Sequence, residues 1–422
     1  MDPSVKETVG EPSHQPPSVA APPRSRLAPI AIPVAMFGLG IALVPPLLVT
    51  IALRLRQISP DNATTNLGLV LGVGAVCAFI ANPLAGRISD RTTSRFGMRK
   101  PWILFGAALG YVGIAMIAVA PNVGVLLVGW AIGQTGFNFA LAALIAMLPD
   151  QVPTSRRGRV ASFISLGQNI TLVAGTFLVQ LFPAGLAQGL VPSAVGILIL
   201  LAVIAPVRDR RLEHRPTEPF GIRQLFGSFV FDPRRHPDLG WAWLTRFCLF
   251  VSQFTATTYL PYFLIDRIGV QESQTATVVF QATLVNGVGL ILTTVLGGWL
   301  SDRSQRRKPF VIGSAVVAGV GLLVLATSTD LTTMFVGQLI LGAGIGAFLS
   351  VELALITDVL PSDETSGKDL GVINIAQALP QSLLPTAAPS VVAAFGYPGL
   401  FVGGALFAVL GALSITRVKN VR

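Results

Sequence analysis

Two charged residues, Arg246 and Glu352, interrupt long apolar runs of this 422-residue sequence. If those runs cross a membrane, each charge costs at least about 2.5–3.5 kcal/mol and needs an opposite charge or a water-filled space. Each lies about six residues, or roughly 9 Å, from the end of its run on the same side of the membrane. We therefore expect the two to pair, with Glu352 as the embedded group that can take up a proton, and predict a coupling role for both. The alternative is that Arg246 snorkels to the interface and that Glu352 lies in the interfacial zone.

A second set of charged residues lies in the short polar segments between apolar runs. The segment after the second run reads GRISDRTTSRFGMRK (86–100), and the one after the eighth reads GGWLSDRSQRRK (297–308). An acid inside a basic cluster suits a gate, because Arg–carboxylate pairs can be bidentate and helix N-termini carry partial positive charge. For the basic members, the positive-inside bias is the competing explanation. The expected gate residues are Gly86, Asp90, Arg91, Arg95, Arg99, Asp150, Arg157, Asp302 and Arg303.

Amide, hydroxyl and phenol side chains inside the apolar runs form a third set. Such groups donate and accept hydrogen bonds without charge, which suits a neutral polyol in a solvated pathway. The alternative is hydrogen bonding between helices, worth about 0.6 kcal/mol on average. The expected solute-binding residues are Gln134, Asn138, Gln168, Asn169, Gln253, Thr257, Tyr259, Tyr262, Gln281, Asn286, Asn374 and Gln377.

The elements that must position these residues are membrane-spanning helices. Hydrophobic residues make up 52% of the sequence and charged residues 12%, about half the share of soluble domains. A helix needs about 20 apolar residues to cross the hydrocarbon core. Twelve runs of about that length occur, near 28–53, 66–86, 102–120, 122–148, 160–182, 189–207, 240–266, 276–300, 309–328, 331–357, 369–394 and 398–416. The net charge of +10 needs no nucleic-acid partner, because it lies mainly in the loops on one side.

The two halves of the chain are related. Asp90 and Asp302 stand 212 residues apart in matching Ser-Asp-Arg contexts, and DQVP (150–153) matches DVLP (358–361). We predict an all-α membrane protein with two pseudo-symmetric six-helix bundles. Its parts are a disordered cytoplasmic tail over 1–27, bundles over 28–207 and 240–416, a cytoplasmic linker over 208–239, and a tail over 417–422. With both termini in the cytoplasm, nearly all of the 30 Lys and Arg residues fall on the inner side of the cell membrane.

The loop GRISDRTTSRFGMRK, the twelve runs and the duplication together resemble the major facilitator superfamily. The extended segment SDRTTSRFGMRKPWI is similar to the sucrose-transporter and glycoside–pentoside–hexuronide:cation symporter branch. The resemblance implies a secondary transporter that moves a small polar solute, a sugar or glycoside, by alternating access. Symporters of that branch carry acidic residues in their first six helices, and the first six runs here have none. That departure leaves H⁺ coupling to Glu352.

Other functions remain open at this stage. An exporter of a hydrophobic compound or secondary metabolite is the first alternative, and a non-transporting sensor or scaffold is the second. An enzyme is not expected, because the runs contain no nucleophile cluster and no HExxH, and ATP-driven transport is not expected, because the sequence has no GxxxxGK(S/T) loop. We expect no cofactor, no metal and no nucleic-acid partner. The expected partners are the solute and the lipid bilayer, and the expected working state is a monomer.

Overall fold

The structure is a computed structural model that describes residues 25–212, 237–304, 307–359 and 366–418. The described residues form helices joined by short turns, and no strand occurs among them. Most of the predicted 1–27 tail and 208–239 linker lies outside the described residues, so that division of the chain stays a prediction.

The N-terminal bundle contains six spans. Its elements are α1 (Ala28–Pro45), η1 (Pro46–Thr50), α2 (Ile51–Ile58), η2 (Pro60–Asn62), α3 (Ala63–Asp90), α4 (Lys100–Val119), α5 (Val123–Gln151), α6 (Thr154–Gln180) and α7 (Leu186–Ile204). The first span runs from Ala28 to Ile58 through a π-helical turn at Pro46. Pro45 and Pro46 offer no backbone N–H, which explains why the regular hydrogen-bond ladder is interrupted there.

The C-terminal bundle is built from α9 (Pro237–Thr258), α10 (Leu260–Phe263), η3 (Leu264–Ile268), α11 (Glu272–Ser304), α12 (Lys308–Thr327), α13 (Leu331–Val359) and α14 (Ser366–Thr416). The chain bends by 50° between α9 and the α10–η3 segment, next to Pro261. The long α14 is two helices joined at Gly396, whose φ of +67° breaks the helix. Within the described ranges, ten helices are long and apolar enough to span a membrane, and the bent pair makes eleven. Dividing α14 at Gly396 gives the predicted twelve, so the predicted fold class is confirmed.

Matching glycines pack helices together in both bundles. In the N-terminal bundle, a Cβ added to Gly129 of α5 would lie 3.0 Å from the Gly113 carbonyl oxygen of α4. In the C-terminal bundle, a Cβ added to Gly337 of α13 would lie 3.2 Å from the Gly321 carbonyl oxygen of α12. Both glycine pairs are separated by the same number of residues, and the second copy of the crossing has the geometry of the first. Small residues at these crossings let the backbones approach closely.

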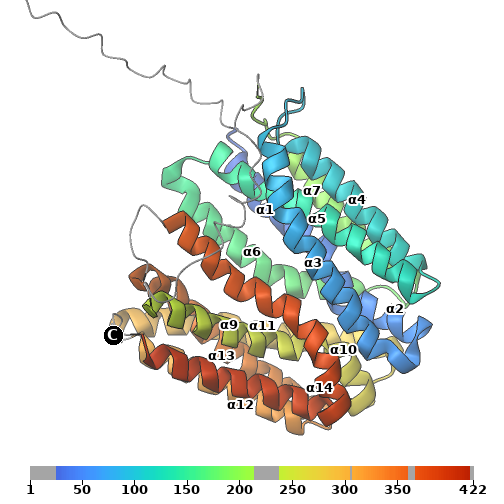
Figure 1. Cartoon of the computed structure of the whole chain (residues 1–422), viewed down its shortest axis with the longest axis vertical. Helices are drawn as coiled ribbons and strands as arrows, with labels where there is room; N and C mark the ends of the chain where they lie inside the picture. The colour runs from blue at the N-terminus through green and yellow to red at the C-terminus, as the bar shows by residue number, and fades with distance from the viewer. Residues whose placement is uncertain (1–24, 213–236, 305–306, 360–365, 419–422) are drawn as a thin grey trace, which may run out of the picture.

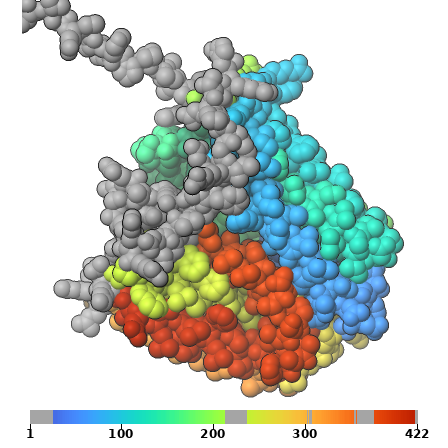
Figure 2. All heavy atoms as spheres, viewed as in Figure 1, coloured from blue at the N-terminus to red at the C-terminus, as the bar shows by residue number. Residues whose placement is uncertain are grey.

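The two bundles meet at one end and diverge at the other (Figure 1). The basic end, as we call it, carries the 91–99 connection and the last turns of α11 and α13; the opposite end carries α2 and η3. Near the opposite end, α3 packs against the first half of α14, where Gly68 lies beside Pro385. There α6 also meets α11, with the ring centroids of Phe177 and Phe280 5.4 Å apart. Figure 2 shows α3 and α14 touching on the face in view. The surface that each bundle turns toward the other is its inter-bundle face.

Candidate functional site

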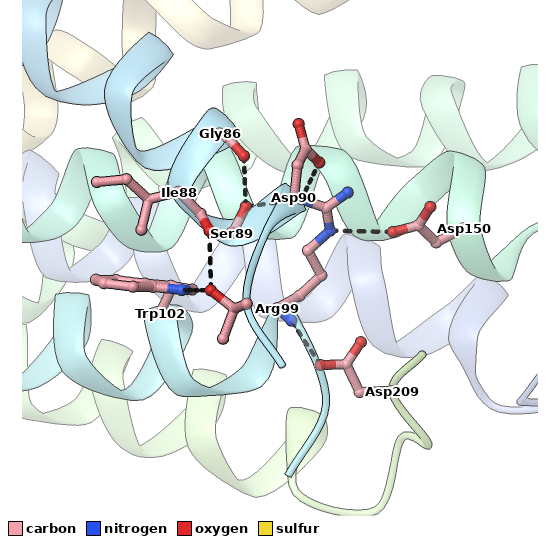
Figure 3. Close-up of polar contacts among 9 residues, drawn as sticks. Gly86, Ile88, Ser89, Asp90, Arg99, Trp102, Asp150 and Asp209 are labelled. Atoms are coloured by element: carbon pink, nitrogen blue, oxygen red, sulfur yellow. Dashed lines mark hydrogen bonds and ion pairs between the residues drawn. The ribbon is translucent and has the colours of Figure 1, made fainter. Parts of the chain in front are cut away.

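The charged cluster at the basic end centres on Arg99, the residue just before α4. Its Nη1 lies 2.5 Å from an Asp90 carboxylate oxygen and 2.7 Å from Ser89 Oγ, and its Nε donates to Asp150 at 3.0 Å (Figure 3). The Arg99 side chain is only 6% exposed. One guanidinium therefore ties the ends of α3 and α5 to the start of α4.

Asp209 completes this cluster, and the sequence analysis did not predict it. One of its carboxylate oxygens accepts from the backbone N–H groups of Arg99 at 2.7 Å and Lys100 at 2.8 Å. It therefore caps the start of α4 from a position 110 residues along the chain. Burial raises the pKa of the Asp209 carboxyl, and the backbone hydrogen bonds oppose that shift. No local capping pattern could have revealed a cap supplied from so far along the chain.

Replacement of Asp209 with alanine should destabilise the protein by about 0.5–2 kcal/mol, because two backbone donors at the start of α4 lose their acceptor. Asp209→Asn keeps an acceptor oxygen and should lose less. The measurement is the melting temperature of the detergent-solubilised protein. Arg208→Ala, at an exposed neighbour, is the control, and an equal loss in the control would contradict the capping role.

The other predicted gate residues take separate positions. Arg157 donates to the Val152 and Pro149 carbonyls, and Arg95 stacks over Phe96 with its guanidinium carbon 4.7 Å from the ring centroid. The Gly86 carbonyl accepts from Ser89 Oγ, while Arg91 is half-buried. Arg303 stacks over Trp299 at 5.6 Å, and the Asp302 side chain lies outside the described residues. The structure thus brings Asp90, Arg99 and Asp150 together within one bundle.

The embedded pair lies in the C-terminal bundle. Arg246 Nη1 of α9 is 2.6 Å from a Glu352 carboxylate oxygen of α13, and the two side chains are 11% and 7% exposed. Arg246 Nη2 also donates to Gln377 Oε1 of α14 at 2.9 Å. The guanidinium carbon lies 5.3 Å from the centroid of the Phe250 ring. Three helices of this bundle therefore meet at Arg246.

Gln377 places this group on the inter-bundle face. It stands eight residues before Pro385, so the two share roughly one side of α14. That side faces α3 at Pro385, and Gln377 is exposed nearer the basic end, where the bundles diverge. Gln253 and Thr257 continue along α9 from Arg246, and both are half-buried.

Buried amides pair α3 with α5 and α11 with α13. Asn138 donates to the Gln134 side-chain oxygen at 3.0 Å and accepts from Asn82 at 3.4 Å. Asn286 donates to the Gln338 side-chain oxygen at 3.2 Å. Asn82 and Gln338 were not among the predicted residues, although the same search for polar residues in apolar runs could have found them. These contacts fit the interhelical alternative for Asn138 and Asn286, whereas Gln134 bonds to Asn138 within its own helix.

The remaining predicted solute-binding residues are scattered. Tyr259 and Tyr262 are buried at the opposite end. Tyr262 joins the bundles by donating to the Ala52 carbonyl at 2.9 Å, whereas Tyr259 donates to the Pro385 carbonyl at 2.8 Å within the C-terminal bundle. Gln168 and Gln281 are exposed, and the Asn169 side chain donates to the Ser165 carbonyl of its own helix. The Asn374 side chain lies outside the described residues.

Ion pairs also join the two bundles at the opposite end. Arg56 of α2 lies 2.7 Å from Asp266 of η3 and 3.6 Å from Glu272 of α11. The Tyr397 hydroxyl donates to Asp266 at 2.8 Å. The sequence analysis did not predict these contacts of Arg56. Together these contacts hold the opposite end closed.

Arg56→Ala should loosen the opposite end, because it removes the cation that pairs with two carboxylates of the other bundle. Such partly exposed pairs contribute about 0–1 kcal/mol each, so the loss of both should raise the open population by up to about thirtyfold. Hydrogen–deuterium exchange over 262–270 measures this opening. Arg54→Ala is the matched control, because Arg54 bonds Gln57 and the Ala120 carbonyl within its own bundle. Equal exchange in the two variants would contradict the prediction.

Among the described residues, no group of three His, Cys, Asp or Glu side chains is placed to hold a metal ion. The chemistry of the described site is therefore that of one ion pair with neighbouring amide, hydroxyl and aromatic groups.

Comparison with known proteins identifies the family. The family model described as Major Facilitator Superfamily matches residues 30–292 and 280–420. The chain belongs to the major facilitator superfamily. It is therefore a multi-pass membrane protein, and proteins of this superfamily are secondary transporters of small solutes rather than enzymes. The resemblance found in the sequence is confirmed.

Relatives within the superfamily carry different solutes. The chain is 24% identical over 287 residues to a gentisate transporter of Corynebacterium glutamicum, covering 66% of this chain and 62% of the relative's length. It is 22% identical over 432 residues to a sucrose transport protein of Arabidopsis thaliana, covering 83% and 82%. A bacterial homologue of the human lysosomal transporter Spinster, in an inward-facing and occupied conformation, has the same fold. Its TM-score is 0.72 at 14% identity, covering 93% of this chain and 96% of that one.

Proposed function

We propose that this superfamily member moves a small polar solute together with a proton by alternating access between its two bundles. The observation that carries the proposal is the Arg246–Glu352 ion pair on the inter-bundle face. An embedded carboxylate in such a position is a group that can carry a proton between the two sides. The bundles touch at the opposite end and diverge at the basic end, which is one of the two states that alternating access requires.

The basic end faces the cytoplasm in this proposal. The positive-inside bias of the loops supports that orientation, with both termini inside the cell membrane. The described conformation is then open toward the cytoplasm. Exposed apolar side chains such as Leu198 and Val295 would be covered by lipid.

The cytoplasmic gate is the cluster at the basic end. Asp90, Arg99 and Asp150 hold the ends of three helices of one bundle in a fixed arrangement. We assign them the role of a surface against which the other bundle closes when the opposite end opens. Asp302 and Arg303 occupy the matching position in the second copy.

The polar side chains near Arg246 suit a solute that has several hydroxyl groups. Gln253, Thr257 and Gln377 supply amide and hydroxyl groups near Arg246, and the sucrose-carrying relative supports a sugar or glycoside. Export of a hydrophobic compound is the second candidate, and the stacked rings of Phe250 and Phe254 on the same helix favour it. Arg246 Nε and Gln253 Oε1 favour a polar solute, because both are buried without a partner among the described residues and a hydrophobic compound cannot supply one.

Counterflow in proteoliposomes tests the proposal. Vesicles loaded with one sugar, glycoside or metabolite should take up the labelled form of a transported compound, and a pH gradient should drive its accumulation. Exchange of hydrophobic compounds alone would favour the exporter. Absence of exchange across the whole panel would contradict transport of these solutes and favour a sensor or scaffold.

A further inference from the structure

The guanidinium of Arg246 has more donors than partners. Its Nη1 faces Glu352 and its Nη2 faces Gln377, whereas the buried Nε has no hydrogen-bond partner among the described residues. Arginine presents five N–H donors in a planar fork that matches a carboxylate. A buried donor without a partner is costly, so this group is prepared for an additional acceptor.

The same face of α9 continues the site away from the charge. Phe250, Gln253 and Thr257 follow Arg246 at helical spacing of four, seven and eleven residues. The Phe250 ring lies under the guanidinium and 6.1 Å from the Phe254 ring. Within the described part of the chain, Gln253 Oε1 is buried without a partner. The strip thus offers a cation, then an aromatic surface, then an amide and a hydroxyl.

We propose that the transported solute is a hydroxylated carboxylate, and that its carboxylate binds Arg246 in the place that Glu352 occupies in the described structure. This inference rests on the proposed function and names its substrate class. The ring or carbon chain of the solute lies along Phe250 and Phe254, and its hydroxyl groups reach Gln253 and Thr257. Glu352 acts as an internal substitute for the solute while the site is empty.

Charge balance then requires a proton. Two carboxylates beside one guanidinium leave one negative charge uncompensated in a buried site, which is unfavourable. Glu352 therefore takes one proton from the adjoining water when the solute carboxylate displaces it from Arg246. One anion and one proton cross together, and the step is electroneutral.

Few other charges act on Glu352. Arg246 is the charged side chain that the described residues place against it, and Gln377 is the neutral neighbour from α14. On α9, α11 and α12, the other charged residues with described side chains stand in the first or last turns; they are Asp238, Glu272, Arg303 and Lys308. The pH dependence of binding therefore reports on the Arg246–Glu352 pair.

Binding of matched acid and neutral probes to the detergent-solubilised full chain tests this inference. The pairs are D-gluconate with D-glucose and benzoate with benzamide, and the readout is the shift in melting temperature with probe concentration at several pH values. The acid of each pair should bind at least tenfold more tightly than the neutral compound. The affinity for the acid should fall about tenfold for each unit by which the pH is raised, over the range in which Glu352 is ionised in the empty site and must take up a proton when the acid binds.

Variants separate the roles of the two residues. Glu352→Gln leaves Arg246 free of its carboxylate, so acid binding should become independent of pH. Arg246→Gln combined with Glu352→Gln removes both charges, keeps a neutral buried pair and should weaken acid binding at least tenfold. Arg267→Gln, at an exposed residue of the opposite end, is the control and should bind like the unmodified protein.

Equal affinity for acids and neutral compounds would overturn the inference, as would acid binding that survives in the double variant. Other results would separate the proposed transport function from the proposed carboxylate site. If the acids bind selectively but no compound exchanges in counterflow, transport is wrong and the carboxylate site stands. If glucose exchanges and Arg246→Gln leaves its rate unchanged, transport stands and the carboxylate site is wrong.

Discussion

Arg99→Ala is expected to lower the free energy of unfolding by about 3–5 kcal/mol, enough to remove most folded protein from a detergent extract. The reason is that Arg99 is the buried partner of two carboxylates and one hydroxyl. Asp150, which is 14% exposed, would be left as a nearly buried charge without its cation. Asp90 is 55% exposed, so water screens its share of the loss.

Two further variants sharpen this prediction. Arg99→Lys keeps the charge, but an ammonium group lacks the fork that reaches Asp90, Asp150 and Ser89 at once, so an intermediate loss is expected. Arg95→Ala removes an exposed basic residue of the same loop and is the control. Melting temperature and the monodisperse fraction on size exclusion are the measurements. If Arg95→Ala and Arg99→Ala behave alike, the loop contributes only its positive charge.

The features that follow from local patterns could be predicted from the sequence. Twelve apolar runs gave the spans, because the bilayer thickness sets the length of a helix that crosses it. The proximity of Arg246 and Glu352 followed from their equal depth in two helices. In the structure Gln377 also contacts Arg246, and equal depth in the membrane does not by itself predict this third residue.

Contacts between distant segments could not be predicted. Asp209 caps α4 from 110 residues away, and Arg56 meets Asp266 in the other bundle. In both cases the partner depends on how helices pack, which apolar periodicity does not specify. The polar residues show the same limit: Asn138 bonds to Asn82 of a neighbouring helix, whereas Gln377 bonds to the charged Arg246, and both lie in similar apolar runs.

The two ends of the molecule have different kinds of charge contact. At the opposite end Arg56 pairs across the bundles, whereas at the basic end Arg99 pairs within one bundle. Contacts across bundles must break when the conformation changes, and contacts within a bundle can persist. The contacts of the opposite end therefore hold the two bundles together in the described structure, and Arg99 fixes the arrangement of α3, α4 and α5 within the N-terminal bundle.

Glu352→Gln is expected to abolish accumulation driven by a pH gradient while exchange of solute continues. A carrier that moves one proton with each solute can hold about a tenfold concentration ratio for one pH unit, since that gradient is worth about 1.4 kcal/mol. Glutamine keeps a side-chain oxygen that can accept from Arg246 at the 2.6 Å contact, but it carries no titratable proton. The internal and external solute concentrations should therefore become equal in the variant.

Uptake into proteoliposomes with and without an imposed pH gradient measures this effect, and counterflow under equal pH shows that the variant still exchanges solute. Asp61→Asn is the control, because Asp61 is an exposed carboxylate at the opposite end. If Glu352→Gln still accumulates solute against its gradient, the proton travels on another group. If the variant loses counterflow as well, Glu352 is needed for solute binding or closure and not for coupling alone.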